Sequence, residues 1–415
     1  MYQFDWQASR RGSALGRAAV PATVWFLGWT SLLTDISSEM VNAILPLYLV
    51  GFLRLSPFQF GIIDGLYQGV SAVLRLAGGY AADRWRRYKE TAALGYGMSA
   101  ICKLGLLAAG SSWPLLATFI AADRTGKGLR TAPRDAMITL TSTKEQLASN
   151  FGVHRAMDAA GALAGPLLAF AILAAAPSRF DIVFVISFCV AIVGLGVIVV
   201  FVDGTLGTLE NRTTPSFAGI MRSLLGQSQF LLLTGAAVVL SIATMSDAFI
   251  YLTLQERLQF APSIFPLFYV ATSLSFALLA APVGRLADRL GSRIVFLAGY
   301  ALLGIVYVTL LLPSAGTIGA IAGVAALGGY YAATDGVLMA IAGRLLPAAQ
   351  CATGLALLST LTSVARFASS VLFGWMWTTG DAASAVRVFG TALIAAIVIA
   401  VIALSKVGEG HLDAR

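Results

Sequence analysis

Charged residues are scarce in this chain of 415 residues: 12% of them are charged, whereas 58% are hydrophobic, and the mean hydropathy is +0.82. So few polar side chains cannot cover a water-soluble globule of this size, and lipid must therefore be the solvent for most of the surface. The long segments also lack the period-2 alternation of an outer-membrane barrel, whereas the 42 glycines suit closely packed helices. The sequence predicts an all-α membrane protein.

Histidine and cysteine are scarce as well. The chain has two histidines and three cysteines, and Cys102, Cys189 and Cys351 are widely spaced within apolar runs. This pattern favours neither a disulfide framework nor a metal site. The chain also lacks a nucleotide-binding loop and the short motifs of zinc peptidases and serine hydrolases. We therefore expect no metal, no cofactor and no enzymatic activity.

Apolar runs of about 20 residues, each long enough to cross a bilayer, recur between short polar breaks. The first run continues from Ala18 into the polar "TDISSEM" without a small-residue cleavage site, so we expect this helix to stay in the mature protein. Twelve spans are predicted, at residues 22–50, 57–82, 91–110, 113–138, 148–175, 181–202, 228–255, 263–284, 293–312, 315–343, 351–378 and 384–406.

Most of the 28 lysine and arginine residues lie near the chain termini or in the even-numbered connections. The odd-numbered connections hold only Arg54, Arg179, Arg257 and Arg387. Because basic residues accumulate on the cytoplasmic side, we expect a protein of the cell (inner) membrane with both termini in the cytoplasm. The net charge of +8 then reflects membrane topology, and we expect no nucleic-acid partner.

The longest hydrophilic break divides the spans into two sets of six: residues 1–202 and 228–415, joined by a cytoplasmic linker at 203–227. The segment "GGYAADRWRRYKE" after the second span is echoed by "VGRLADRLGSRIV" after the eighth, and Asp35 in the first span by Asp247 in the seventh. Two pseudo-symmetric six-helix bundles are typical of secondary transporters, whose cargo binds between the halves near the bilayer midplane.

The repeated loop carries a recognisable motif. It resembles the G-x-x-x-D-R-x-G-R-K signature of the major facilitator superfamily (MFS), and the resemblance extends over nearly the whole chain. The first copy has Arg86 in place of a glycine, and the second copy is complete. The resemblance implies a monomer with a cytoplasmic latch that favours the outward-facing state, and the latch residues it implies are Gly79, Asp83, Arg84, Gly284, Asp288, Arg289 and Arg293.

Two further motifs lie in the fourth and fifth spans. Arg124 opens "RTGKG", which is similar to the family motif R-x-x-Q-G that is associated with proton transfer. We expect the following charges, Arg130, Arg134 and Asp135, to lie at the water boundary. The fifth span resembles the signature of the drug and metabolite:proton antiporters, although Ala169 and Phe170 replace its last two glycines, and its matching residues are Gly152, Gly161, Gly165 and Pro166.

Carboxylates occur within the spans of the amino half. Asp35 and Glu39 are four residues apart and thus share one helix face. Such groups are costly in lipid unless they meet a cavity, a cation or a proton, and a desolvated carboxylate can exchange protons near neutral pH. With Arg124, Arg155 and Asp158 they form the candidate proton-coupling group. The alternative is a static network of salt bridges that holds the half together.

The carboxyl half has fewer charges within its spans and more aromatic and hydroxyl side chains. A neutral aromatic wall opposite a charged one suits an amphiphilic cargo, although aromatic residues in spans often serve packing alone. The candidate cavity residues are His154, Asp247, Tyr251, Tyr331, Asp335 and Arg366.

These features predict a proton-coupled secondary transporter in the lipid bilayer, whose partners are a small-molecule cargo and protons. Export by antiport is favoured because of the motif in the fifth span. The alternative is a proton-coupled uptake symporter for a siderophore, a carboxylate or a similar metabolite. A receptor with a transporter fold would bind its ligand without any flux.

Overall fold

A computed structural model describes residues 20–85, 87–143, 146–203, 217–312 and 316–407, apart from the side chains of 75–85, 217, 218, 220, 348, 349 and 352. Within these ranges the chain forms helices and no strand. The amino-half helices are α1 (Ala22–Pro46), α2 (Pro57–Trp85), α3 (Tyr88–Ala108), α4 (Trp113–Leu140), α5 (Leu147–Ala175) and α6 (Phe180–Phe201). A π-helical segment, η2 (Leu47–Phe52), continues α1.

The carboxyl half begins after the short helix α7 (Phe217–Leu225). Its helices are α8 (Ser228–Ile242), α9 (Asp247–Leu258), α10 (Phe265–Leu290), α11 (Ser292–Leu311), α12 (Gly316–Leu345), α13 (Ala348–Thr379) and α14 (Ala382–Ser405), with the 3-10 turn η3 (Pro262–Ile264) before α10. Because α8 and α9 share one span, the helices make twelve spans, which confirms the predicted fold class. In the described residues, nine spans are apolar enough to cross a membrane by length and composition; α1, α2 and α4 are outside that set.

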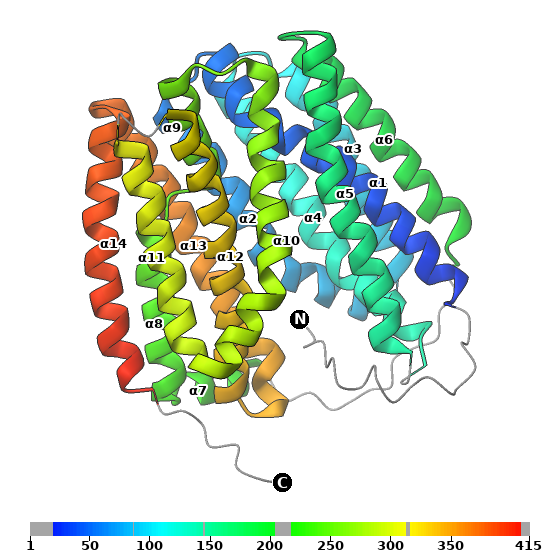
Figure 1. Cartoon of the computed structure of the whole chain (residues 1–415). Helices are drawn as coiled ribbons and strands as arrows, with labels where there is room; N and C mark the ends of the chain where they lie inside the picture. Colours follow the sequence, from blue (N-terminus) through cyan, green and yellow to red (C-terminus); the bar gives the residue numbers. More distant parts are fainter. Residues whose placement is uncertain (1–19, 86, 144–145, 204–216, 313–315, 408–415) are drawn as a thin grey trace.

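The spans form two bundles (Figure 1). In the amino half α1 packs against α5 and α6, and α4 packs against α2 and α3; in the carboxyl half α12 packs against α10 and α11, and α8 against α13 and α14. Figure 1 shows the carboxyl half nearly upright on the left and the amino half slanting to the lower right. The two halves therefore diverge toward the end at which α1 begins and α14 ends.

At the opposite end the halves are in contact, chiefly where α2 packs against α13. A β-carbon at Gly61 would lie 2.5 Å from Ser370 O, and one at Gly65 would lie 2.7 Å from the Phe367 ring. The backbones of the two helices therefore touch. We call this contact the seam; it is formed by Pro57, Gly61 and Gly65 of α2 and by Phe367, Ser370 and Gly374 of α13.

The seventh span is interrupted at residues 243–246, where we had expected one continuous helix over 228–255. Side chains satisfy the backbone groups of this break. Tyr307 Oη accepts from Met245 N at 2.7 Å and donates to Ala243 O at 3.0 Å, and Ser369 Oγ donates to Thr244 O at 2.5 Å. The break is short and has long apolar segments before and after it, so a search for spans by mean hydropathy joins the two helices.

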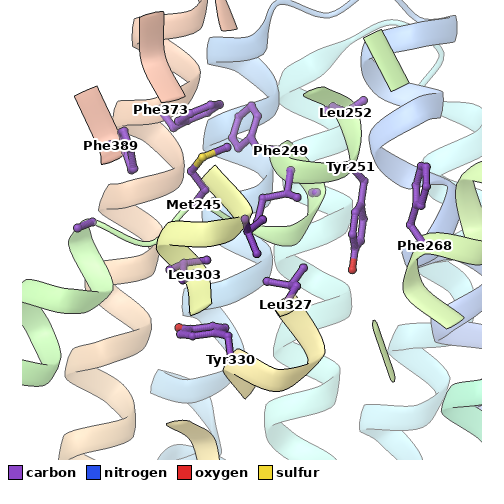
Figure 2. Packing of buried hydrophobic residues seen from close by; sticks show 14 of the residues in the cluster. Met245, Phe249, Tyr251, Leu252, Phe268, Leu303, Leu327, Tyr330, Phe373 and Phe389 are labelled. Atoms are coloured by element: carbon purple, nitrogen blue, oxygen red, sulfur yellow. The ribbon is translucent and has the colours of Figure 1, made fainter. Parts of the chain in front are cut away.

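Aromatic side chains fill the core beside this break (Figure 2). The ring of Phe249 lies 5.0 Å from that of Phe60 and 4.8 Å from that of Phe373, and Phe373 in turn contacts Phe389. The outer faces of the helices are apolar as well, and they expose large residues such as Val193, Val200, Ile318, Ile394 and Val398. A surface of this kind suits contact with lipid chains.

Candidate functional site

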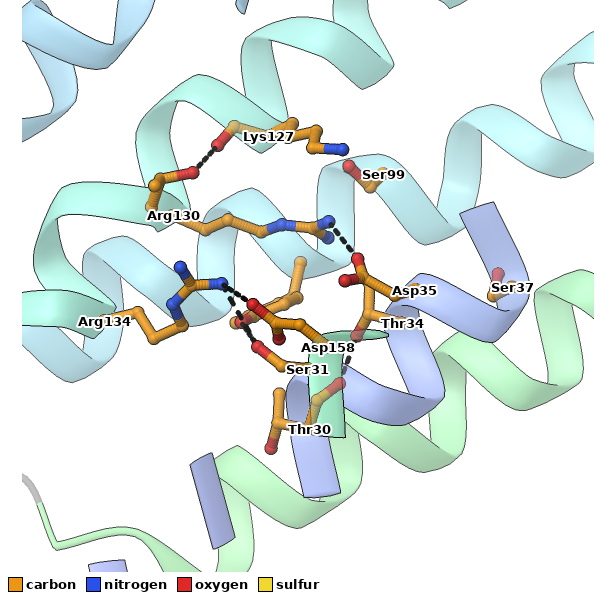
Figure 3. A network of polar contacts seen from close by, with 12 residues as sticks. Thr30, Ser31, Thr34, Asp35, Ser37, Ser99, Lys127, Arg130, Arg134 and Asp158 are labelled. Atoms are coloured by element: carbon orange, nitrogen blue, oxygen red, sulfur yellow. Dashed lines mark hydrogen bonds and ion pairs between the residues drawn. The ribbon is translucent and has the colours of Figure 1, made fainter. Parts of the chain in front are cut away.

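Polar side chains of α1, α4 and α5 meet inside the amino half (Figure 3). Asp35 of α1 faces Arg130 of α4, with Oδ1 and Nη2 3.8 Å apart. The Arg130 guanidinium also lies over the Tyr96 ring, 4.5 Å from its centroid. This ring face and the carboxylate both attract the guanidinium, so Arg130 is held between α1 and α3.

Asp158 of α5 is the centre of a second cluster. Its Oδ2 lies 3.9 Å from Arg134 Nη1, 3.7 Å from Arg155 Nη1 and 3.6 Å from His154 Nδ1. The Arg155 side chain is 60% exposed, whereas that of Arg134 is 9% exposed. Arg134, which also pairs with Asp135 at 2.9 Å, is therefore the buried cation beside Asp158, and Arg155 approaches Asp158 from the surface.

Ser31 of α1 joins this cluster. Arg134 Nη1 donates to Ser31 Oγ at 3.2 Å, and Ser31 Oγ lies 3.0 Å from His154 Nε2. His154 has no exposed surface. We expected His154 to line a cavity, but it is instead packed between helices of the amino half.

Arg130 and Arg134 correct one expectation from the sequence. We expected them at the water boundary, yet they are 3% and 7% exposed. Helix α4 continues to Leu140, so both residues lie more than one turn inside it and are covered by neighbouring helices. Hydropathy placed the end of the span near 138, and the charges themselves made that end look polar.

Arg124, a member of the candidate proton-coupling group, hydrogen-bonds to its neighbour in α4. Both Nε and Nη2 donate to Asp123 Oδ2, and the guanidinium lies 3.9 Å from the centroid of the Tyr67 ring. Lys103 Nζ is 3.7 Å from Asp123 Oδ1. Lys103, Asp123 and Arg124 are each buried as whole residues. Arg124 is thus bound directly to Asp123 and Tyr67, and it interacts with Glu39 electrostatically. Glu39 Oε2 accepts a hydrogen bond from Asn42 Nδ2 at 3.0 Å.

The glycines of the fifth-span motif lie against α1. A β-carbon at Gly161 would be 2.6 Å from Leu32 O and 3.1 Å from Asp35 Cβ. At Gly165 it would be 2.7 Å from Ile36 O and 2.9 Å from Glu39 Cβ. The motif therefore brings the backbone of α5 directly against the turns of α1 that carry the two carboxylates. Pro166 is a buried residue within α5, and Gly152 lies one turn into the helix.

The second copy of the latch motif makes its contacts within the carboxyl half. The side chains of Gly79, Asp83 and Arg84 lie outside the described residues. In the second copy Asp288 Oδ1 is 3.8 Å from Arg344 Nη2 of α12, and both side chains are about half exposed or more. Arg293 Nη1 donates to Leu404 O at 3.2 Å. These contacts lie within the carboxyl half, and the remaining motif residues, Gly284 and Arg289, are partly buried and exposed, respectively.

The carboxyl half holds its charges with hydroxyl groups. Tyr331 Oη donates to Asp247 Oδ1 at 2.6 Å, and Arg366 Nη2 donates to Tyr330 Oη at 3.4 Å. Arg366 also interacts electrostatically with Asp247 and Asp335. Tyr251, in contrast, is fully buried, and its hydroxyl lies 2.6 Å from Thr272 Oγ1. Tyr251 thus packs in the protein interior. Asp335, by contrast, is exposed.

A pocket between the halves contains an acid that the sequence analysis missed. Asp64 of α2 is 7% exposed, and Ser370 Oγ of α13 donates to its Oδ2 at 2.6 Å. A single acid in "FGIIDGLYQGV" was the available signal, but its partner is 306 residues away. The described residues that line the pocket are Asn42, Leu45, Pro46, Phe60, Ile63, Asp64, Tyr67, Gln68, Asp247, Ala248 and Tyr269.

Metal ligands do not gather in the described part of the chain: it holds no group of three or more His, Cys, Asp or Glu side chains that could bind an ion.

The sequence is similar to those of known proteins. Residues 27–275 match the sequence profile of the Major Facilitator Superfamily. An uncharacterized MFS-type transporter of Methanocaldococcus jannaschii is 32% identical over 290 residues, which cover 68% of this chain and 70% of that protein. An uncharacterized protein of Mycobacterium tuberculosis is 29% identical over 170 residues, 41% of each chain.

Solved structures share the fold at low identity. A peptide transporter superposes with a TM-score of 0.76 at 16% identity, covering 93% of this chain and 94% of the other. The nucleoside transporter NupG gives a TM-score of 0.73 at 13% identity over 92% and 98% of the two chains. A bacterial homologue of the lysosomal transporter Spinster, in an inward-facing conformation, gives 0.68 at 15% identity over 94% and 96%.

Proposed function

The chain belongs to the major facilitator superfamily and is therefore a secondary transporter, and we propose that it exports a small amphiphilic organic molecule in exchange for protons. As a member of this family it is a multi-pass membrane protein with a small-molecule cargo, and not an enzyme. The proposed cycle is alternating access between the two halves. The proposed setting is the inner membrane, with a monomer whose termini are cytoplasmic.

The pair of Asp35 and Arg130 carries the proposal. The Asp35 side chain is 22% exposed, so protons can reach it, whereas the Arg130 side chain is 4% exposed. When Asp35 takes up a proton, Arg130 loses its counter-charge inside the protein, and the arrangement of α1 and α4 becomes less favourable. A proton on Asp35 would thus be felt by the helices that must move.

Packing of α5 supports a role for this pair in movement. The contact of Gly161 with Leu32 and Asp35 leaves no space for α5 to shift without moving α1. This contact lies within the motif that resembles the antiporter signature. Export is favoured for that reason, with Asp158 and Glu39 as further proton carriers beside Asp35.

The cargo class is inferred from the side chains that line the pocket between the two halves. The pocket between the halves combines aromatic rings, amides and two acids, including Tyr67, Gln68, Asp247 and Tyr269. Aromatic surface with a few polar groups suits an amphiphilic organic molecule. Proton-coupled uptake remains the second candidate, because Ala169 and Phe170 stand where the antiporter signature has glycines.

Liposomes that contain the protein and an internal pH dye test the proposal. A proton gradient is imposed, and amphiphilic drugs, siderophores and organic anions are added in turn. We expect cargo-dependent proton movement that is lost in Asp35→Asn and retained in part in Asp35→Glu. Proton and cargo moving in the same direction would establish uptake instead, and unchanged transport in Asp35→Asn would remove Asp35 as the carrier.

A further inference from the structure

Asp64 is a buried acid at the contact between the two halves. Its carboxylate accepts a hydrogen bond from Ser370 of α13, and Ser246, which caps α9, also hydrogen-bonds to it. Both partners are hydroxyl groups of the carboxyl half. They can donate to either a carboxylate or a carboxylic acid, but they supply no positive charge.

The seam closes off Asp64 from one end of the protein. A β-carbon at Gly374 would clash with Pro57 O, and Phe58 N donates to Thr378 Oγ1 at 2.8 Å. Asp64 lies one turn deeper than Gly61 on α2. Water from this end can therefore reach Asp64 only when α2 and α13 separate, and that separation removes the bond to Ser370.

On its other side Asp64 faces the pocket between the halves. The titratable and charged groups around it come from every neighbouring helix. Asp247 of α9, Tyr269 of α10 and Tyr67 of α2 line the pocket with Asp64 and interact with it electrostatically. Farther out are Arg124 and Asp123 of α4 at the Tyr67 ring, Glu39 of α1, which binds Asn42, and Arg366, one turn before Ser370 in α13. Asp247 has the same sign of charge as Asp64 and interacts with it unfavourably across the pocket, and the hydrogen bonds of Arg124 are already made to Asp123.

We propose that Asp64 is a second proton site, separate from Asp35, whose protonation permits the seam to close. An ionised Asp64 in the closed seam would be a buried charge with only hydroxyl partners and an acid across the pocket, which is unfavourable. A neutral carboxylic acid fits the same place and still accepts the Ser370 hydrogen bond. The closed seam therefore selects the protonated form.

The geometry gives the route of the proton. While the seam is open, the Asp64 carboxylate takes a proton from water at that end, and the seam closes around the neutral acid. The proton then leaves to water through the pocket, and the carboxylate that remains favours the next opening. The role of this proton in transport rests on the proposed function. The pH-dependent closing of the seam does not depend on it.

Two spin labels across the seam test the proposal without any cargo. Phe52→Cys and Thr379→Cys place labels at exposed positions on either side, in a background in which Cys189 and Cys351 are serine and the buried Cys102 is kept. The distance distribution is measured in nanodiscs between about pH 5 and pH 9. We expect the short, closed distance to be lost as the pH rises, and to persist at every pH in Asp64→Asn.

Two further variants keep the test decisive. Ser370→Ala removes the hydroxyl without changing charge, and we expect about a fivefold shift from closed to open at a given pH. Asp35→Asn should keep the pH response of the seam even where proton transport is lost, so failure of the proposed function is told apart from failure of this inference. A native seam with no pH response, or a response retained in Asp64→Asn, would overturn it.

Discussion

The two halves of this transporter hold their buried charges in different ways. In the amino half the carboxylates of Asp35, Asp123 and Asp158 each pair with a guanidinium or ammonium group. In the carboxyl half Asp247 is held by the hydroxyl of Tyr331. Fixed opposite charges lock a structure, whereas neutral donors tolerate a change in charge. Apart from Asp64, the amino half thus holds its carboxylates by charge pairs, in which loss of a charge has a large effect, and the carboxyl half holds Asp247 by a neutral donor.

Removal of one member of an amino-half pair should have the largest effect. Asp123→Ala leaves Lys103 and Arg124 buried without their shared counter-charge, and we expect the free energy of unfolding to fall by about 3 to 5 kcal/mol. Unfolding in detergent measures this loss. Asp181→Ala is the matched control, because Arg179 and Asp181 form an exposed pair. Equal stability of the two variants would break the comparison.

Removal of a neutral donor in the carboxyl half should cost less. Tyr331→Phe deletes the hydrogen bond to Asp247, and we expect a loss of about 0.5 to 1.5 kcal/mol in the free energy of unfolding. Asp247→Asn and the double variant complete a mutant cycle, which isolates the energy of this pair. A coupling energy as large as that of the amino-half pairs would show that both halves are locked alike.

The exposed pair of the latch motif should matter least for stability. The side chains of Asp288 and Arg344 are 74% and 49% exposed, so Asp288→Ala should change the free energy of unfolding by less than about 1 kcal/mol. Added salt should weaken even this effect, which the same unfolding assay can check. A clear loss of stability at high salt would point to a structural role for the pair.

The sequence was sufficient for the spans because each one is a long apolar run with polar breaks on either side. It was less informative about pairing. Asp35 meets Arg130 and Asp64 meets Ser370 across helices that are distant in the chain, and no periodicity within one helix shows such contacts. The break before Asp247 was also missed, although the sequence carries a signal for it: Ser246 is a typical helix N-cap, and Asp247 is an acid in the first turn of α9.

The sequence also led to a wrong prediction about which charged side chains are buried. Arg130 and Arg134 follow a charged stretch at a predicted span end, where basic residues usually reach water. Arg130 meets Asp35 of α1, and Arg134 bonds to its neighbour Asp135 and also faces Asp158 of α5. The packing of α1 and α5 against α4 therefore buries the two arginines, and the sequence of α4 alone does not show it.

The break in the seventh span has a consequence for the stiffness of the protein. Met245 N is an amide outside any helix, yet it is bonded to Tyr307, which also holds Ala243 O. Adjacent serines of α13 extend this support, since Ser369 binds the break and Ser370 binds Asp64. We therefore expect the Met245 amide to exchange with deuterium as slowly as helix amides do. Because Ser369 binds the break and Asp247 directly follows it, we expect a shift of α13 to displace Asp247 as well.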